Sequence, residues 1–119
     1  MRALVVAHDR RVLEHVGHVV SDQGFECTQC LDGQSAWDLI EAGEIFDLMV
    51  AQMMLPWKDG WELSQIRESG GFLANVLLTQ QWHMITDFEQ FGQVRFSALP
   101  VNEWHLIMQI AKAIQLTGE

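Results

Sequence analysis

Two kinds of hydrophobic pattern alternate along the chain. Short, continuous apolar segments such as ALVV at 3–6 are typical of strands that are buried on both faces of a sheet. Between these segments, apolar residues recur at three- and four-residue spacing, which places them on one side of a helix. We therefore predict strands at 3–6, 25–30, 48–52, 75–79 and 94–98, and helices at about 10–23, 34–42, 60–70, 84–91 and 102–116.

The alternation of strands and helices predicts the architecture. Strands joined through helices by short connections run parallel and are linked by right-handed crossovers, so helices cover both faces of one sheet. A chain of 119 residues fits a single α/β domain that occupies 1–119. In such sheets a ligand site lies at the carboxyl ends of the strands. The residues expected at these ends are 7–9, Gln52, 79–80 and 99–100.

The charge of the chain excludes some partners. Seven Lys and Arg against sixteen Asp and Glu give a formal net charge of −9, which repels nucleic acid backbones and anionic membrane surfaces. No apolar run approaches the ~20 residues that cross a bilayer, and the amino terminus lacks a signal-peptide cleavage pattern. We expect a cytoplasmic domain that binds neither nucleic acid nor membrane.

Cys27 and Cys30 form a CxxC motif, which in isolation suggests a redox pair or half of a zinc site. Redox pairs of this kind lie at a helix amino terminus, where the helix dipole lowers the thiol pKa, whereas this pair falls in a predicted strand. His15 and His18 are candidates to complete a zinc site, but the pattern of the first helix directs His18 to solvent. We expect neither a metal nor a redox role, and free thiols fit a reducing compartment.

The segment FDLMVAQMMLPWKDG at 46–60 reads as a buried strand that runs into a loop. With its surroundings, it resembles the receiver domains of response regulators, the CheY-like family of two-component signalling. The resemblance covers 2–116 and rests on the strand–helix order, FDL, MMLPWKDGWEL, the LDG turn at 31–33, Thr79 and Pro100. It implies a flavodoxin-like fold, in which a doubly wound, five-stranded parallel sheet has the order 2-1-3-4-5.

The resemblance also implies a chemistry from which this sequence departs. In receivers, a carboxylate at the end of the third strand accepts a phosphoryl group, and acidic residues after the first strand hold Mg²⁺. The acceptor position here is Gln52, and Ala7 and His8 stand at the metal-binding positions. Leu99 stands where the family has a lysine that contacts the phosphoryl group.

These replacements predict a degenerate receiver. An amide is not a nucleophile comparable with a carboxylate, and Mg²⁺ requires hard oxygen ligands. We expect no aspartyl phosphate, no Mg²⁺ or other cofactor, and no enzymatic activity. His8 and Gln52 are expected to hydrogen-bond each other and to lock one conformation. Thr79, which contacts the phosphoryl oxygen in the family, is expected to bond local backbone instead.

Four further positions have expected roles. Asp9 is expected to cap the first helix, and Asp59 is expected to form a turn rather than to replace the phosphoacceptor. The resemblance implies a cis peptide bond between Leu99 and Pro100. Phe96 occupies the position of the family's switching aromatic residue. Because phenylalanine has no hydroxyl group to satisfy, core packing or an interface role is favoured over a switch.

Five tryptophans without a tyrosine point to a protein partner, because exposed tryptophan is enriched at interfaces. By the resemblance, Trp82, Phe96 and Trp104 mark a face made by helix 4, strand 5 and helix 5, which receivers use for dimerisation and output. Our leading hypothesis is phosphorylation-independent binding of a protein partner, or self-association, through this face. Two alternatives remain open: a small-molecule site around His8, Gln52 and Thr79, and the receiver part of a longer transcriptional regulator.

Overall fold

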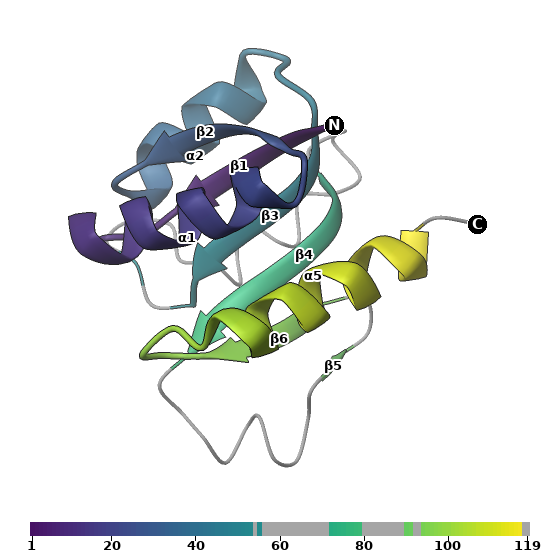
Figure 1. Ribbon diagram of the computed structural model, residues 1–119. Helices are drawn as coiled ribbons and strands as arrows, with labels where there is room; N and C mark the ends of the chain where they lie inside the picture. Colours follow the sequence, from purple (N-terminus) through teal and green to yellow (C-terminus); the bar gives the residue numbers. More distant parts are fainter. Residues whose placement is uncertain (54, 56–71, 80–89, 92–93, 118–119) are drawn as a thin grey trace.

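A central sheet with helices on both sides forms the molecule (Figure 1). The structure is a computed structural model that describes residues 1–53, 55, 72–79, 90–91 and 94–117. The strands are β1 (Arg2–Val6), β2 (Glu26–Cys30), β3 (Phe46–Gln52), β4 (Phe72–Thr79), β5 (Gln90–Phe91) and β6 (Val94–Ala98). The helices are α1 (Arg10–Asp22), α2 (Gly33–Glu41) and α5 (Glu103–Thr117).

The sheet has the order β2-β1-β3-β4-β6-β5. The first five of these strands pair in parallel, which confirms the predicted order 2-1-3-4-5, with β6 as the predicted fifth strand. The two-residue strand β5 pairs antiparallel with β6 at the sheet edge. The predicted helix at 84–91 is therefore wrong at its last two residues, because Gln90 and Phe91 lie opposite Arg95 and Val94. The predicted helix at 60–70 lies outside the described residues.

The helix ends follow the sequence signals. The Asp9 carboxylate accepts a hydrogen bond from the Arg11 main-chain N–H at 2.7 Å, so it caps α1 as predicted. At the other end of α1, Gly24 has a φ of 94°, a left-handed conformation that glycine adopts without strain. The Leu99–Pro100 peptide bond is cis, as the resemblance implied.

Asp32 is the equivalent cap of α2. Its carboxylate accepts a hydrogen bond from the Ser35 main-chain N–H at 2.7 Å. Hydrogen bonds from the main chain and the side chain of Ser35 hold the pKa of the Asp32 carboxyl below its usual range, and the charge of His8 acts in the same direction. The ionised form of Asp32 is therefore tied to the start of α2.

Alternate side chains of the central strands enter two apolar clusters on opposite faces of the sheet. The α1–α5 cluster, packed under α1 and α5, includes Val5, Leu13, Leu48, Val76 and Leu106. The α2 cluster, on the other face, includes Leu4, Ile40, Met49, Leu77 and Phe96. Full burial of each such side chain stabilises the fold by about 1.5–3 kcal/mol, so the central strands have no room for polar chemistry along most of their length.

One exception is a polar network between β6 and α5. Arg95 Nε donates to Gln109 Oε1 at 2.5 Å, and Gln109 Nε2 lies 3.1 Å from His105 Nε2. The His105 Nδ1 atom lies 3.2 Å from Ser97 Oγ. Arginine only donates, so the Gln109 oxygen accepts and its amide group donates to His105 Nε2. His105 Nε2 therefore accepts, and Nδ1 is left to donate to Ser97 Oγ.

Replacing Gln109 with leucine should destabilise the protein, because it removes the acceptor of Arg95 Nε and the donor to His105 in a buried site. The expected loss is about 1–3 kcal/mol of unfolding free energy, measured by urea denaturation. Met108→Leu, on the exposed side of the same helix, is the control and is expected to change stability by less than about 0.5 kcal/mol. Equal stability of the two variants would contradict the assigned network.

Replacing Asp32 with alanine is expected to cost about 1 kcal/mol at neutral pH, because α2 loses its cap. Asp32→Asn keeps a side-chain oxygen as acceptor and should cost less. Because the pKa of Asp32 is lowered in the folded state, its ionic contribution is present above the unfolded-state pKa and is lost as the pH falls through the folded-state pKa. Denaturation curves at a series of pH values test this, and a pH-independent difference between wild type and Asp32→Ala would refute it.

Candidate functional site

The carboxyl ends of β1, β3, β4 and β6 lie side by side at one edge of the sheet, as their order requires. Main-chain hydrogen bonds continue past the strand ends: the N–H of Met53 donates to Leu78 at 2.8 Å, and the N–H of Leu99 donates to Thr79 at 2.9 Å. The structure therefore brings the predicted pocket positions Ala7, Gln52, Thr79 and Leu99 to the same edge.

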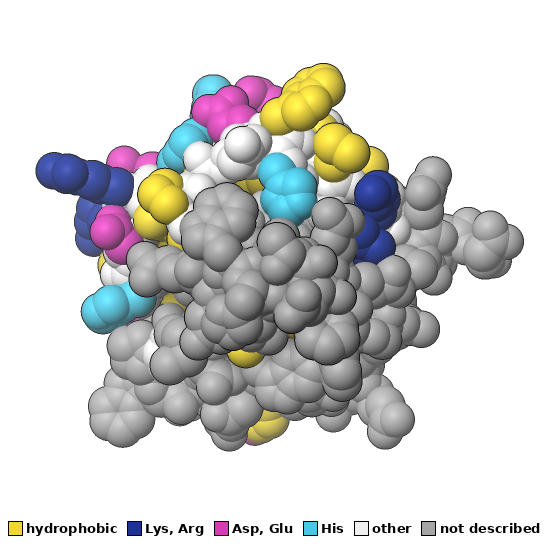
Figure 2. All heavy atoms as spheres, turned by 90° about the horizontal axis from the view of Figure 1, so that it is seen from below, with side chains coloured by type: hydrophobic (Ala, Val, Ile, Leu, Met, Phe, Trp, Pro, Cys, Tyr) yellow, Lys and Arg dark blue, Asp and Glu magenta, His cyan; other side chains and the backbone are white. Residues whose placement is uncertain are grey.

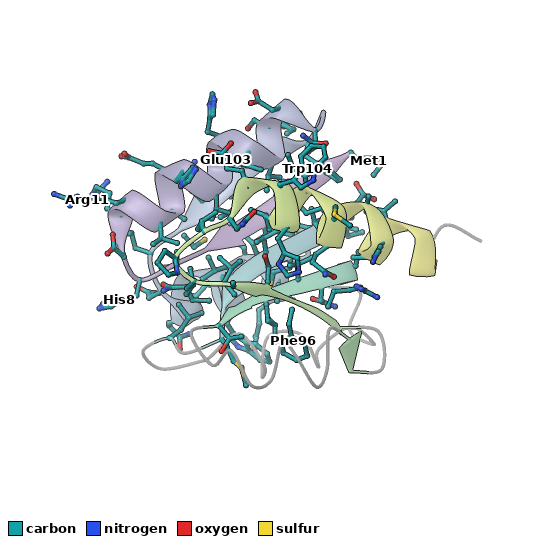
Figure 3. The ribbon with its side chains drawn as sticks, turned by 60° about the horizontal axis from the view of Figure 1, so that its bottom comes forward. Met1, His8, Arg11, Phe96, Glu103 and Trp104 are labelled. Carbon is teal, nitrogen blue, oxygen red and sulfur yellow. The ribbon has the colours of Figure 1, made fainter. Side chains whose placement is uncertain are left out.

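Gln52 is hydrogen-bonded to the segment that follows β1. Its Oε1 atom accepts from the main-chain N–H of His8 at 2.5 Å. The predicted contact between these residues is present, but it joins a side chain to the main chain and does not use the imidazole. His8 itself is exposed (Figure 3). The side-chain oxygen of Gln52, at the position of the phosphoryl acceptor in receivers, is thus hydrogen-bonded to the main chain. This bond joins the end of β3 to the β1–α1 connection.

The other pocket positions are packed into the protein. Ala7 is fully buried, Leu99 is 7% exposed, and both belong to the α1–α5 cluster. Thr79 is 4% exposed. Leu99 therefore fills apolar space at the position where a lysine would carry a charge. Burial of these positions leaves Gln52 and His8 as the more accessible members of the predicted pocket.

The carboxylates of this edge act as helix caps. Asp9 caps α1 and Asp32 caps α2, so both are hydrogen-bonded to main-chain N–H groups. The LDG turn predicts the position of Asp32 but not its role as a charged group at the strand ends. The available signal was an aspartate between a strand and a helix, three residues before Ser35. Within the described residues, no cluster of three or more His, Cys, Asp and Glu could hold a metal ion.

The two cysteines point to opposite faces of the sheet. Cys27 packs against the α1–α5 cluster and receives a hydrogen bond from Ser21 Oγ at 3.3 Å, whereas Cys30 belongs to the α2 cluster. Burial, with a smaller effect of Asp32, raises the pKa of the Cys30 thiol to about 11. Such a thiol is not a nucleophile at neutral pH. The CxxC motif in this strand therefore lacks the geometry of a redox pair, and the Cys30 thiol lacks the acidity of a redox thiol.

The two histidines of the CxxC hypothesis contact carboxylates instead. His15 Nε2 lies 2.6 Å from Glu103 Oε2, which joins α1 to α5, and His18 Nε2 lies 3.4 Å from Asp22 Oδ2. His18 is largely exposed, as the pattern of α1 predicted. Neither contact involves a cysteine.

Phe96 and Trp104, two of the three residues predicted to form an interaction face, lie on different sides of the sheet. Trp104 on α5 is 74% exposed, whereas Phe96 is 1% exposed and packs in the α2 cluster (Figure 3). Of the two interpretations of Phe96, the structure supports core packing. Trp82 lies outside the described residues. Trp104 is thus the predicted interface residue that is exposed in the described part of the chain.

Comparisons with curated proteins reveal relatives among response regulators. No family model matches the chain. The response regulator MprA of Mycolicibacterium vanbaalenii is 38% identical over 80 residues, which are 66% of this chain and 34% of that protein. The transcriptional regulatory protein DltR of Streptococcus agalactiae is 31% identical over 80 residues, which are 66% of this chain and 35% of that protein. The matches thus span about a third of the length of these relatives.

Solved structures share the fold over nearly the whole chain. A response regulator receiver protein from Sinorhizobium medicae has a TM-score of 0.77 at 16% identity and covers 97% of this chain and 94% of its own. The chemotaxis response regulator CheY4 of Vibrio cholerae has a TM-score of 0.73 at 19% identity and covers 94% of this chain and 97% of its own. The chain thus has the fold of solved receiver proteins, and over 80 residues its sequence is similar to those of response regulators.

Proposed function

We propose that this domain is a degenerate receiver that transmits signals by phosphorylation-independent protein contact and is not an enzyme. The observation that carries the proposal is the hydrogen bond of Gln52 Oε1 to the main-chain N–H of His8. A neutral side chain at the end of β3 makes a contact that holds this edge together without a ligand. The proposal places the domain in the cytoplasm, where response regulators meet their partners.

The chemistry of the strand ends supports this proposal. Transfer of a phosphoryl group to a receiver needs a carboxylate nucleophile and cations that neutralise the phosphoryl oxygens. The end of β3 offers an amide, and Mg²⁺ prefers carboxylate and other hard oxygen ligands over the groups at Ala7 and His8. Leu99 is packed into the α1–α5 cluster and brings no charge. We therefore propose that the domain uses neither Mg²⁺ nor another cofactor.

Signalling without a phosphoryl group requires a contact surface, and Trp104 supports one on α5. A tryptophan that is 74% exposed is a strong anchor for a protein partner. We keep the face that receivers form with their fourth helix, their fifth strand (β6 here) and α5 as the proposed region, with Trp82 and Trp104 as its proposed contacts. Phe96 belongs to the core of β6 and is not a proposed contact. The net charge of −9 argues against direct nucleic acid binding by this domain.

A compatible second possibility is that the domain is the receiver part of a longer transcriptional regulator. The names of the relatives favour it, since DltR is called a transcriptional regulatory protein and MprA a response regulator. Both relatives are longer than the matched segment, which covers about a third of each. In such a regulator, the contact surface of this domain would act on the rest of the chain or on a second protein.

The proposal is tested with acetyl phosphate and Mg²⁺, followed by intact-mass spectrometry. The expected result is no mass increase by a phosphoryl group, because Gln52 lacks a nucleophilic carboxylate. A receiver that carries aspartate at the end of its third strand is the positive control in the same buffer. A stable phosphoryl adduct on this chain, or tight Mg²⁺ uptake in titration calorimetry, would overturn the proposal.

The lack of charge at position 52 is tested by comparing Gln52→Asp with Gln52→Asn, which have nearly the same shape and differ in charge. At neutral pH the aspartate variant should be less stable, because Leu99 stands where receivers have a compensating lysine. A poorly compensated carboxylate has a raised pKa in the folded state, so the difference should grow as the pH rises through that pKa and vanish at acidic pH. Equal stability of the two variants at all pH values, measured by thermal unfolding, would show that the edge tolerates charge.

A further inference from the structure

The outer side of α5 carries an exposed apolar row. Trp104 is 74% exposed and Met108, one helical turn later, is 43% exposed, while Ala111 extends the row by another turn. The opposite side of the helix packs on the sheet through Leu106 and Gln109. Isolated exposed apolar residues are ordinary, but a row that includes tryptophan is typical of a binding surface.

This row continues into a groove toward α1. The groove has a volume of about 330 Å³ and is lined by Met1, Gln23, Phe25, Ile107, Ile110, Ala111 and Ile114. Ala111 belongs to both the row and the groove, and Ile107 lies one turn after Trp104. Figure 3 shows Trp104 and Met1 on the same side of the molecule, with Phe96 on the far side of the sheet. The continuous apolar surface of the described residues therefore faces α1.

The shape of this surface fits a helix better than a small molecule. A volume of 330 Å³ is at the lower end of small-molecule sites. The exposed residues Trp104 and Met108 are not among those that line the groove. An amphipathic helix contacts such a surface with side chains at i, i+3, i+4 and i+7, which enter a groove while the remaining apolar face lies on the row. The row spans about two turns, or ~10 Å, along α5.

Charge selects the kind of helix. Three acidic groups border this region: Glu103, which contacts His15, Asp22, which contacts His18, and Glu26, which follows Phe25. Two basic groups lie beside them, the amino group of Met1 in the groove lining and Lys112 after Ala111, so the acidic groups outnumber the basic ones by one. Figure 2 shows exposed hydrophobic side chains beside acidic and histidine side chains at the upper edge of that view. A second copy of the chain would bring another net charge of −9 to this surface, which disfavours self-association. A partner with a basic polar face is attracted by the same charges.

We propose that the α5 row and its groove bind a cationic amphipathic helix of a partner protein. This inference rests on the proposed function and specifies its partner. It also differs from the expectation drawn from the family, because it places the contact on the α1 side of α5. Trp104 is the anchor that lies on the row, and the groove accepts aliphatic side chains next to it.

The test is a titration of the intact domain with a designed helical peptide of about 18 residues, or five turns, with leucines on one face and lysines on the other. Binding measured by calorimetry should weaken at least about tenfold in Trp104→Gln and should decrease with added salt. Leu31→Gln is the control, because Leu31 is an exposed apolar residue at 37% and follows Cys30, which packs in the α2 cluster on the other face of the sheet. Its affinity for the peptide should equal that of the wild type.

Three results would overturn this inference. The first is that a peptide with glutamates in place of the lysines binds the domain as tightly as the lysine peptide does. The second is that Trp104→Gln binds the lysine peptide as tightly as the wild type does, and the third is that the wild type does not bind the lysine peptide. Sedimentation that shows a dimer disrupted by Trp104→Gln would assign the surface to a second copy and would also reject the cationic partner. Acetyl phosphate labelling tests the proposed function separately, so failure of the peptide to bind an unlabelled domain counts against this inference alone.

Discussion

Burial of the central strands on both faces is the constraint that shapes this domain. Side chains of β1, β3 and β4 alternate between the α1–α5 cluster and the α2 cluster, and nearly all are apolar. Polar groups are expensive to bury without partners, so chemistry is confined to the strand ends. What the domain can do therefore depends on the few residues at the carboxyl edge and on the outer surfaces of its helices.

At the carboxyl edge, the residues form a self-contained arrangement. Gln52 bonds the main chain at His8, Leu99 packs into the core, and Asp9 and Asp32 satisfy the first N–H groups of α1 and α2. A cluster of acidic side chains in such a place repels itself until a cation binds. Gln52 and Leu99 add no further charge to the two carboxylates of this edge, each of which is already bonded to the start of a helix.

Most of the fold could be predicted because continuous apolar segments and their spacing report burial directly. The strand order followed from the resemblance, and the cap at Asp9 followed from its place before a helix. Two kinds of detail could not be predicted. Strand β5 consists of two residues whose pairing depends on contact with β6 and leaves no periodic signal. The exact partner of Gln52 also required coordinates, since its main-chain bond and an imidazole bond fit the same sequence.

The face to which a residue points was the weakest part of the prediction of site residues. Phe96 and Trp104 were grouped because both are aromatic and belong to neighbouring elements in receivers. Strand alternation directs Phe96 into the α2 cluster, whereas α5 lies on the other face of the sheet. For the same reason the CxxC motif lost its apparent meaning, since residues three apart in a strand point in opposite directions.

The network of Arg95, Gln109, His105 and Ser97 sets the rotation of α5 about its own axis. Each donor of the network has one acceptor. Rotation of α5 by the angle of one residue would therefore break these hydrogen bonds. Trp104 and Met108 lie on the outer side of α5, away from β6. They take no part in the polar network, but the network orients the helix and so determines that they face outward. The exposed residues of α5 and the residues that orient the helix are therefore different sets of residues. Substitutions on the outer side can therefore change the exposed surface of α5 while the helix keeps its orientation.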